Sequence, residues 1–416
     1  MKRILEPGLF TTTTMTPNDF DPLPDPHNTP PSSCGLAWSQ PECGGAPPLP
    51  EDVATALRSD RLEAACAALE CWQMGLPEGT QRLQSMFLAA HVLLQHGWRQ
   101  AGLEQLRRAL AQSRLSGGCQ GVADGLLTGH DDLLARLCAE ALEAGIEPCS
   151  ARRIVEHVGL RPPSPCLLHW PYPVRIYTLG QTVMLLHGQP LRFSGKAQRR
   201  PLLLLHSLLA RGGRAVPVTL LRQSLGEGDG FGDAPLSRGG FDMALSRLRH
   251  LLALPELLQL GDGLLSLNQD LCWVDAWTCE RLLLQVDQTT DPACGQVLLE
   301  HALGLYEGDF LAGEETAWTV LARERIRARL QRVARRLGEA FERAGRQVEA
   351  DALYERMREL FPLDEELCLR LLRSHLRRNE YGQAVSLHTR CRELLAKVLG
   401  VLPGPAIEAL FEPARA

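Results

Sequence analysis

The sequence predicts a mostly α-helical protein with a small β component, divided into several domains. Three observations support this fold class. Apolar residues recur at helical spacing over most of the chain, one central stretch changes to the period-two alternation of strands, and 416 residues exceed what one core usually holds. Hydrophobic residues make up 45% and charged residues 22% of the chain, which is ordinary globular usage.

Residues 1–50 are predicted to be a disordered tail. This stretch contains eleven prolines and few aliphatic side chains. Such a composition cannot bury enough apolar surface to offset the loss of chain entropy on folding.

Residues 51–165 are predicted to form about five antiparallel helices. Leu62, Ala65 and Leu69 share one face of a helix, and glycine-containing breaks occur at 75–79 and 96–97. The pattern is similar to the end of a tetratricopeptide-like array, but no strict 34-residue period is present, so a generic helical scaffold stays open. A Pro-rich stretch at 161–165 predicts a hinge.

Residues 170–275 are predicted to form a winged-helix domain. Val174, Ile176 and Thr178 alternate with residues of the opposite face, and a second run, 183–187, ends at a turn signal in 188–190. Helices are expected at about 197–211, 217–225 and 236–252. A hairpin over 257–272, turned by an Asp-Gly pair, completes the winged-helix order of strands, three helices and a hairpin.

Residues 276–416 are predicted to be helical again, with six or seven helices separated by breaks near 308–313, 345, 362 and 379–382. Ala340, Ala344 and Ala350 are small residues at helical spacing, as expected where paired helices of a repeat array approach closely.

The central domain carries a local positive charge within an acidic chain. The net charge of the whole protein is -5. Residues 192–252 nevertheless hold ten Lys or Arg against four Asp or Glu. Because duplex DNA presents a dense row of phosphates, such a surface favours DNA as a partner. A merely solvated helix surface in an arginine-rich chain is the alternative.

The third helix of this domain is the candidate reader of DNA. Phe241, Leu245 and Leu248 would face the core, leaving a polar stripe on the opposite side. A helix of this kind fits the major groove with its N-terminal residues near base edges. The candidate base-reading residues are Ser237, Arg238 and Asp242, and the candidate phosphate contacts on this helix are Ser246, Arg247 and Arg249. Because Gly239 and Gly240 are poor helix formers, the helix could also begin only there.

Further phosphate contacts are predicted at the first two helices. Lys196, Arg199 and Arg200 lie at the start of the first helix, where side chains and backbone amides together can hold a phosphate. Arg222 would act similarly from the second helix.

No catalytic, cofactor or metal site is predicted. The chain lacks a P-loop, a GxGxxG after a strand, a GxSxG elbow and an HExxH helix, and its thirteen cysteines lack zinc-site spacing. Apolar runs are too short to span a bilayer, and no signal-peptide core precedes Glu6 and Pro7. The expectation is a cytoplasmic protein without enzymatic activity.

Several motifs resemble a known family in their order along the chain. The central segment resembles the response-regulator type of winged helix found in antibiotic-pathway activators, and the C-terminal segment resembles the bacterial transcriptional activator domain, a tetratricopeptide-like module. The residues carrying these resemblances are Val174-Arg175-Ile176, Gly188-Gln189-Pro190-Leu191, Gly195 to Arg200 and Ser246 to Arg249, then Tyr306 to Leu311, Trp318, Arg323-Glu324-Arg325, Pro362 to Glu365, Leu399-Gly400 and Pro403. Trp170-Pro171-Tyr172-Pro173 and the helices before it are similar to the sensor region of large maltose-activator-like regulators, whose ATPase portion this sequence lacks.

The resemblance implies a transcriptional activator that binds promoter DNA. It also implies binding to direct repeats and RNA polymerase as a protein partner. A homodimer is a further expected partner, and the sequence leaves the oligomeric state open. Two departures stand out: Leu225-Gly226 replaces the family's Leu-Trp, and the hairpin tip at Asp262 carries no cation. They motivate the alternative of a helical protein-interaction scaffold with a degenerate winged helix that does not bind DNA.

Overall fold

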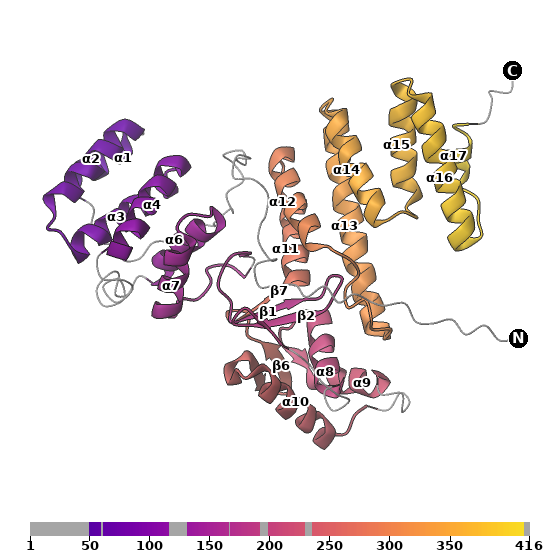
Figure 1. The fold of residues 1–416 in the computed structure, drawn as a ribbon, viewed down its shortest axis with the longest axis horizontal. Coiled ribbons are helices and arrows are strands. Elements are labelled where there is room, and N and C mark those ends of the chain that lie inside the picture. The colour runs from indigo at the N-terminus through magenta and orange to yellow at the C-terminus, as the bar shows by residue number, and fades with distance from the viewer. Residues whose placement is uncertain are drawn as a thin grey trace, which may run out of the picture.

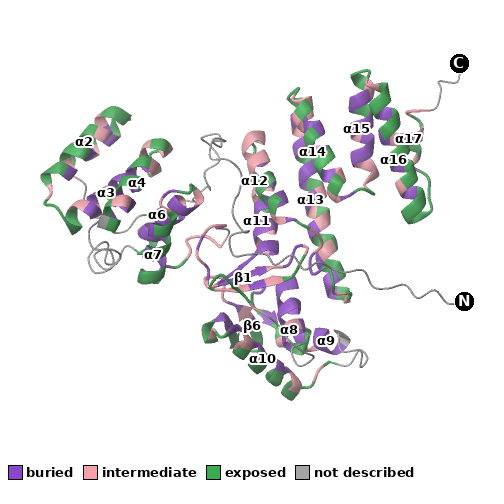
Figure 2. Cartoon of the chain, in the orientation of Figure 1, coloured by how far each residue is buried: buried purple, intermediate pink, exposed green. Residues whose placement is uncertain are grey.

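A computed structural model describes residues 50–59, 61–115, 131–165, 167–191, 199–228 and 235–411. Of the predicted tail, only Pro50 is among them. The described chain is mostly helical, as predicted, with two small sheets near its middle (Figure 1). In most helices, buried residues follow one side and exposed residues the other (Figure 2).

The N-terminal array contains six described helices where the sequence predicts about five. They are α1 (Glu51–Arg58), α2 (Leu62–Gly75), α3 (Thr80–Gln95), α4 (Arg99–Leu115), α6 (Asp131–Glu143) and α7 (Pro148–Val158). The predicted break at 75–79 separates α2 from α3, and that at 96–97 separates α3 from α4. An additional break follows α6, where Gly145 adopts a φ of 65° and Pro148 begins the next helix.

The stretch that follows the predicted hinge is packed against the central sheet. Trp170 and Tyr172 are 2% and 4% exposed and share one apolar cluster with α3, α4, α6, α7 and Trp273. Arg175 donates hydrogen bonds to the carbonyls of Leu168 and Trp170 at 2.6 and 2.7 Å. Its guanidinium lies 5.1 Å from the ring centroid of Trp273. The N-terminal array is therefore docked on the central domain.

The central domain, residues 174–274, contains two sheets. The first has the order β3-β2-β1-β7, with β7 parallel to β1 and the other pairs antiparallel. The second has the antiparallel order β4-β6-β5. The strands are β1 (Val174–Tyr177), β2 (Val183–Leu186), β3 (Gln189–Pro190), β4 (Val216–Pro217), β5 (Leu258–Gly261), β6 (Leu264–Leu267) and β7 (Cys272–Val274).

Two turns of this domain follow from local backbone chemistry. Asp262 and Gly263 both have left-handed φ values, 51° and 73°, which suits the two-residue β5–β6 hairpin turn predicted at this pair. The turn after β2 lies one residue earlier than predicted, at His187 and Gly188. Gln189 and Pro190 pair with β2 instead of turning.

Three helices occupy the predicted positions of this domain: α8 (Arg199–Ala210), α9 (Val218–Gly228) and α10 (Arg238–Leu252). The C-terminal domain then has seven described helices, within the predicted range. They are α11 (Asp275–Gln288), α12 (Pro292–Leu305), α13 (Ala317–Arg343), α14 (Gln347–Leu360), α15 (Glu365–Arg377), α16 (Tyr381–Leu399) and α17 (Pro405–Glu408). Helix α13 packs against α8 as well as against α11, α12 and α14.

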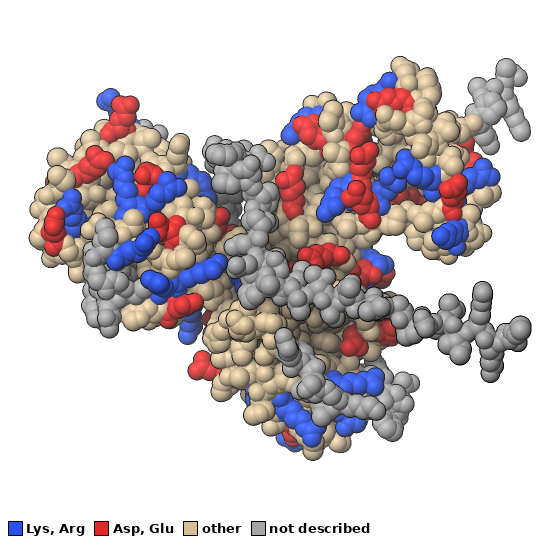
Figure 3. All heavy atoms as spheres, viewed as in Figure 1, with Lys and Arg blue, Asp and Glu red and all other residues tan. Residues whose placement is uncertain are grey.

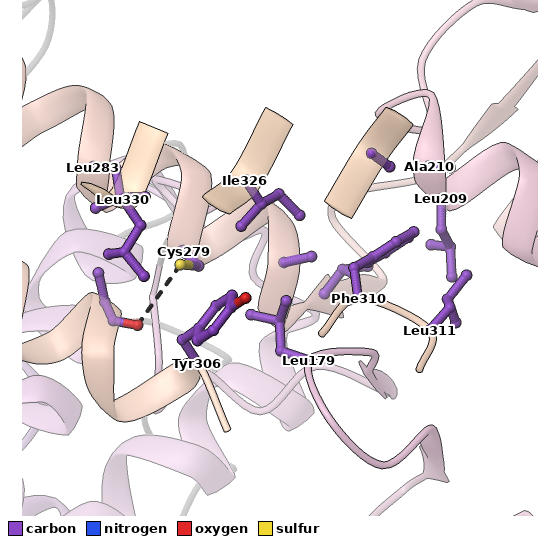
Figure 4. Close-up of a cluster of buried hydrophobic side chains, with 14 of the residues drawn as sticks. Leu179, Leu209, Ala210, Cys279, Leu283, Tyr306, Phe310, Leu311, Ile326 and Leu330 are labelled. Carbon is purple, nitrogen blue, oxygen red and sulfur yellow. Dashed lines mark hydrogen bonds between the residues drawn. The ribbon is translucent and has the colours of Figure 1, made fainter. Parts of the chain in front are cut away.

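The central and C-terminal domains share one continuous hydrophobic core. Leu179 and Leu209 from the central domain lie in the same buried cluster as Phe310 and Ile326 from the C-terminal domain (Figure 4). Leu179 and Phe310 also form an isolated β-bridge. The predicted boundary near residue 275 thus passes through a packed interior, and the two domains form one body.

Candidate nucleic-acid interface

Helix α10 is fixed by a cap at its start and by apolar residues along its inner side. The hydroxyl of Ser237 accepts a hydrogen bond from the backbone N–H of Gly240 at 3.2 Å. The helix therefore begins at Arg238, and the glycine pair does not delay it. Phe241, Leu245 and Leu248 are buried, as the helical spacing predicts. The opposite side of α10 is left to face solvent.

Most of the predicted DNA-contacting residues of α10 lie on this exposed side. Arg238, Asp242, Ser246 and Arg247 are all exposed, and Met243 between them is 56% exposed. In the orientation of Figure 3, Lys and Arg side chains gather at the end of the molecule where α9 and α10 lie. Among the described residues, no other segment covers this face.

Arg249 has a different position from the other arginines of α10. It is half-buried, and its Nη2 donates a hydrogen bond to the carbonyl of Leu258 at 3.1 Å. Leu258 is the first residue of β5. Arg249, expected to contact a phosphate, therefore ties α10 to the β5–β6 hairpin.

Arg222 of α9 also makes a contact inside the domain. Its Nε donates to the carbonyl of Leu236 at 2.6 Å, and the backbone N–H of Leu236 donates to the carbonyl of Arg222 at 2.9 Å. These two bonds hold the residue immediately before the Ser237 cap. Arg222 thus positions the N-terminal end of α10, where the sequence predicts a phosphate contact.

The cationic start of α8 is described only in part. Arg199 and Arg200 are exposed in its first turn, whereas Lys196 lies outside the described residues. The pKa of Glu314 is lowered, first by its contact with His206, whose Nδ1 lies 3.3 Å from Glu314 Oε1, and further by the positive charge of Arg199. Arg199 therefore acts electrostatically on the loop that precedes α13.

Arg214 is an exposed cation that the sequence analysis counts in the basic segment without choosing it as a site residue. Its loop is bound to the second sheet, because the N–H of Ala215 donates to Ser266 Oγ at 2.8 Å. The N–H of Leu267 likewise donates to the carbonyl of Gly213 at 2.7 Å. Arg214 thus lies beside the β5–β6 hairpin, which is the predicted wing. The positive φ values of Gly212 and Gly213 identify a turn directly before Arg214. The position of Arg214 beside the hairpin follows only from the pairing of the next residues with β6.

Arg211, another cation of the basic segment, is directed inward. Its Nη2 donates to Ser224 Oγ at 2.9 Å, and its guanidinium lies 5.9 Å from the ring centroid of Trp318. It joins α8 to α9 and to α13. The charge excess of the segment is therefore divided between exposed cations and cations that hold elements together.

The described residues contain no group of three His, Cys, Asp or Glu side chains placed to hold a metal ion. Within the same residues, no helix has the length and apolar character needed to cross a membrane.

Comparison with known proteins gives a family match for the C-terminal domain. Residues 274–414 match the model of the bacterial transcriptional activator domain. No curated protein matches the chain. Among solved structures, Mycobacterium tuberculosis EmbR in complex with a low affinity phosphopeptide is similar, with 21% sequence identity and a TM-score of 0.43. The similarity covers 57% of this chain and 64% of EmbR, which is less than two thirds of the EmbR chain.

Proposed function

We propose that this protein is a transcriptional activator that binds promoter DNA through α10 and contacts other proteins, RNA polymerase among them, through its helical domains. The observation that carries this proposal is the exposed face of α10, capped at Ser237 and bearing Arg238 and Arg247. The match of residues 274–414 to the activator domain supports the regulatory part.

The exposed residues of α10 divide by position. Ser237, Arg238 and Asp242 lie at its N-terminal end. In helices that bind the major groove of DNA, this end lies near the base edges. Ser246 and Arg247 lie farther along and suit phosphates. Arg214 beside the hairpin, with Arg199 and Arg200 on α8, adds further positive charge. Arg222 and Arg249 support the interface by fixing both ends of α10 and are not proposed as direct contacts.

The test begins with immunoprecipitation of the tagged protein from cells to find its DNA targets. Binding of the enriched fragments is then measured by fluorescence anisotropy between about 50 and 200 mM salt. Arg247→Ala is expected to weaken binding to all sequences and to reduce the slope of log affinity against log salt by about 0.9. Arg238→Ala should cost about 1 to 3 kcal/mol on the preferred site and relax its specificity.

Arg343→Ala is the control, because Arg343 is an exposed cation at the end of α13. It should leave the affinity unchanged. Equal effects of all three substitutions would mean that only the overall charge matters, which contradicts a role for α10.

A protein-interaction scaffold without DNA binding is the second candidate. It is favoured by the exposed carboxylates of Asp242 on α10 and Asp262 at the hairpin tip, which would repel phosphates. Absence of enriched DNA fragments, together with no anisotropy change at low salt, would support it.

A further inference from the structure

A groove on the C-terminal domain lies between α14, α15 and α16 and has a volume of about 290 Å³. Its walls include Glu355 and Arg358 from α14 and Ser386 and Arg390 from α16, while His375 and Leu371 of α15 also line it. The groove belongs to a different part of the molecule from α10. It is more polar than a packing defect between helices, which would be lined by apolar side chains.

Arg358 is the reason to regard this groove as a binding site. Its Nε is buried and has no hydrogen-bond partner among the described residues. Burying a group of a permanent cation without a partner is costly, so such an atom calls for an explanation. A bound anion would supply the missing acceptor.

Arg390 brings a second guanidinium to the same groove. Its Nε and Nη2 donate to the carbonyl and the hydroxyl of Ser386, at 3.3 and 3.1 Å. Both acceptors are neutral, so these bonds orient the guanidinium without balancing its charge. Arg356, on the same helix as Arg358, is different because it pairs with Glu359 at 2.9 Å and does not line the groove.

The acidic groups near the groove do not balance the positive charge of the residues that line it. His375 pairs with Glu380 at 2.8 Å, and Glu380 also contacts Arg378 at 3.0 Å. The hydrogen bond from His375 is the first cause that lowers the pKa of Glu380. Glu355 is the one carboxylate among the lining residues, against the two guanidinium groups of Arg358 and Arg390.

We propose that this groove binds a small organic oxyanion, a carboxylate or phosphate carried on a polar molecule. Arg358 and Arg390 would hold the oxyanion by charge-assisted hydrogen bonds, and Ser386 and Glu355 would meet polar groups on the rest of the ligand. The volume lies near the lower end of the range for small-molecule sites and exceeds the needs of an inorganic ion alone. The inference goes beyond DNA binding and does not depend on it.

The experiment measures binding to the full-length protein by titration calorimetry at constant ionic strength. The probes are inorganic phosphate, citrate and glycerol 3-phosphate, which separate the bare ion from the two organic forms. At least one organic anion should bind with a stoichiometry of one and more tightly than inorganic phosphate. Arg390→Gln should weaken that binding at least tenfold, and the paired Arg356→Gln should change it by less than twofold.

A second variant tests the unpartnered Nε of Arg358 without any ligand. Arg358→Met keeps much of the apolar stem and removes the charge, so it should raise the melting temperature of the ligand-free protein and abolish anion binding. Three results would overturn the proposal: no saturable binding of any probe, equal weakening by Arg356→Gln, or a lower melting temperature for Arg358→Met. DNA binding by Arg390→Gln should equal that of the unmodified protein, which separates this proposal from the DNA-binding one.

Discussion

At the scale of single residues, Gly213 shows how closely the central and C-terminal domains approach. It has a φ of 67°, and a Cβ at this position would lie 2.2 and 2.4 Å from two atoms of the Trp277 ring. The ring is held in place, because Trp277 Nε1 donates to the carbonyl of Leu209 at 3.0 Å. Only glycine therefore fits here without displacing the Trp277 ring.

We expect Gly213→Ala to destabilise the protein far more than Gly212→Ala. Gly212 has a similar φ of 82° but nothing within 4 Å of an added Cβ, so its substitution costs only about 1 to 2 kcal/mol of backbone strain. Gly213→Ala adds overpacking and should cost about 1 to 3 kcal/mol more. Urea unfolding of both variants measures the difference, and equal losses would show that the Trp277 ring can move.

Asp275 is a buried carboxylate that joins β1 to the start of α11. Its oxygens accept from the backbone N–H and hydroxyl of Thr178, each at 2.7 Å, and from the N–H groups of Leu179 and Ala276 at 2.9 and 2.6 Å. Four donors converge on one side chain. Burial is nevertheless the largest influence on its pKa, which is raised.

Asp275→Asn should lower the free energy of unfolding by about 2 to 4 kcal/mol, because an amide NH₂ would face donors that lose their acceptor. Asp291→Asn is the matched control. Asp291 caps α12 by accepting from the N–H groups of Ala293 and Cys294, and asparagine caps a helix about as well as aspartate. Chemical denaturation should therefore show little change in the free energy of unfolding for Asp291→Asn. A similarly small change for Asp275→Asn would show that the hydrogen bonds of the Asp275 carboxylate contribute little to stability.

At the scale of elements, the β5–β6 hairpin is the part of the proposed DNA interface whose charge opposes binding. Its tip carries the exposed Asp262 in a left-handed conformation that asparagine also tolerates. Charge can therefore be removed there without disturbing the turn.

If the hairpin approaches the phosphate backbone, Asp262→Asn should raise the affinity for DNA several-fold at low salt and less at high salt. The melting temperature should stay the same. The control is Glu256→Gln, because Glu256 is an exposed carboxylate near the base of the hairpin. Anisotropy titrations on one DNA fragment measure both, and an unchanged affinity for Asp262→Asn would place the tip away from the duplex.

The sequence predicts those elements whose signals are local. The inner side of α10 follows from helical spacing, and the hairpin turn follows from the Asp-Gly pair. The contacts of Arg222 and Arg249 are not predictable in this way, because their acceptors, Leu236 and Leu258, belong to other elements. An arginine next to a core position can serve a phosphate or a carbonyl, and only the packing of the domain decides which.

At the scale of the whole molecule, the central and C-terminal domains should unfold together. Their shared core includes Leu179, Leu209, Phe310 and Ile326, so separating the domains would expose a large apolar surface. The glycine beside Trp277 and the Asp275 carboxylate both lie at this junction. The predicted winged helix is therefore not an independent module in this chain.

A fragment ending at Val274 should accordingly fail to show a cooperative thermal transition, or should aggregate. The full chain should show one transition that includes α8 and α13, measured by hydrogen exchange of their amides. Independent protection of α8 in the fragment, equal to that in the full chain, would contradict the shared core.

The strand β7 has a consequence for communication between the ends of the protein. Trp273 packs with the N-terminal array, while its neighbours Cys272 and Val274 pack into the core shared by the other two domains. Helix α11 begins at the next residue, without an intervening loop. The N-terminal array and α11 are therefore joined by three residues of backbone, Cys272 to Val274, each of which is held by packing.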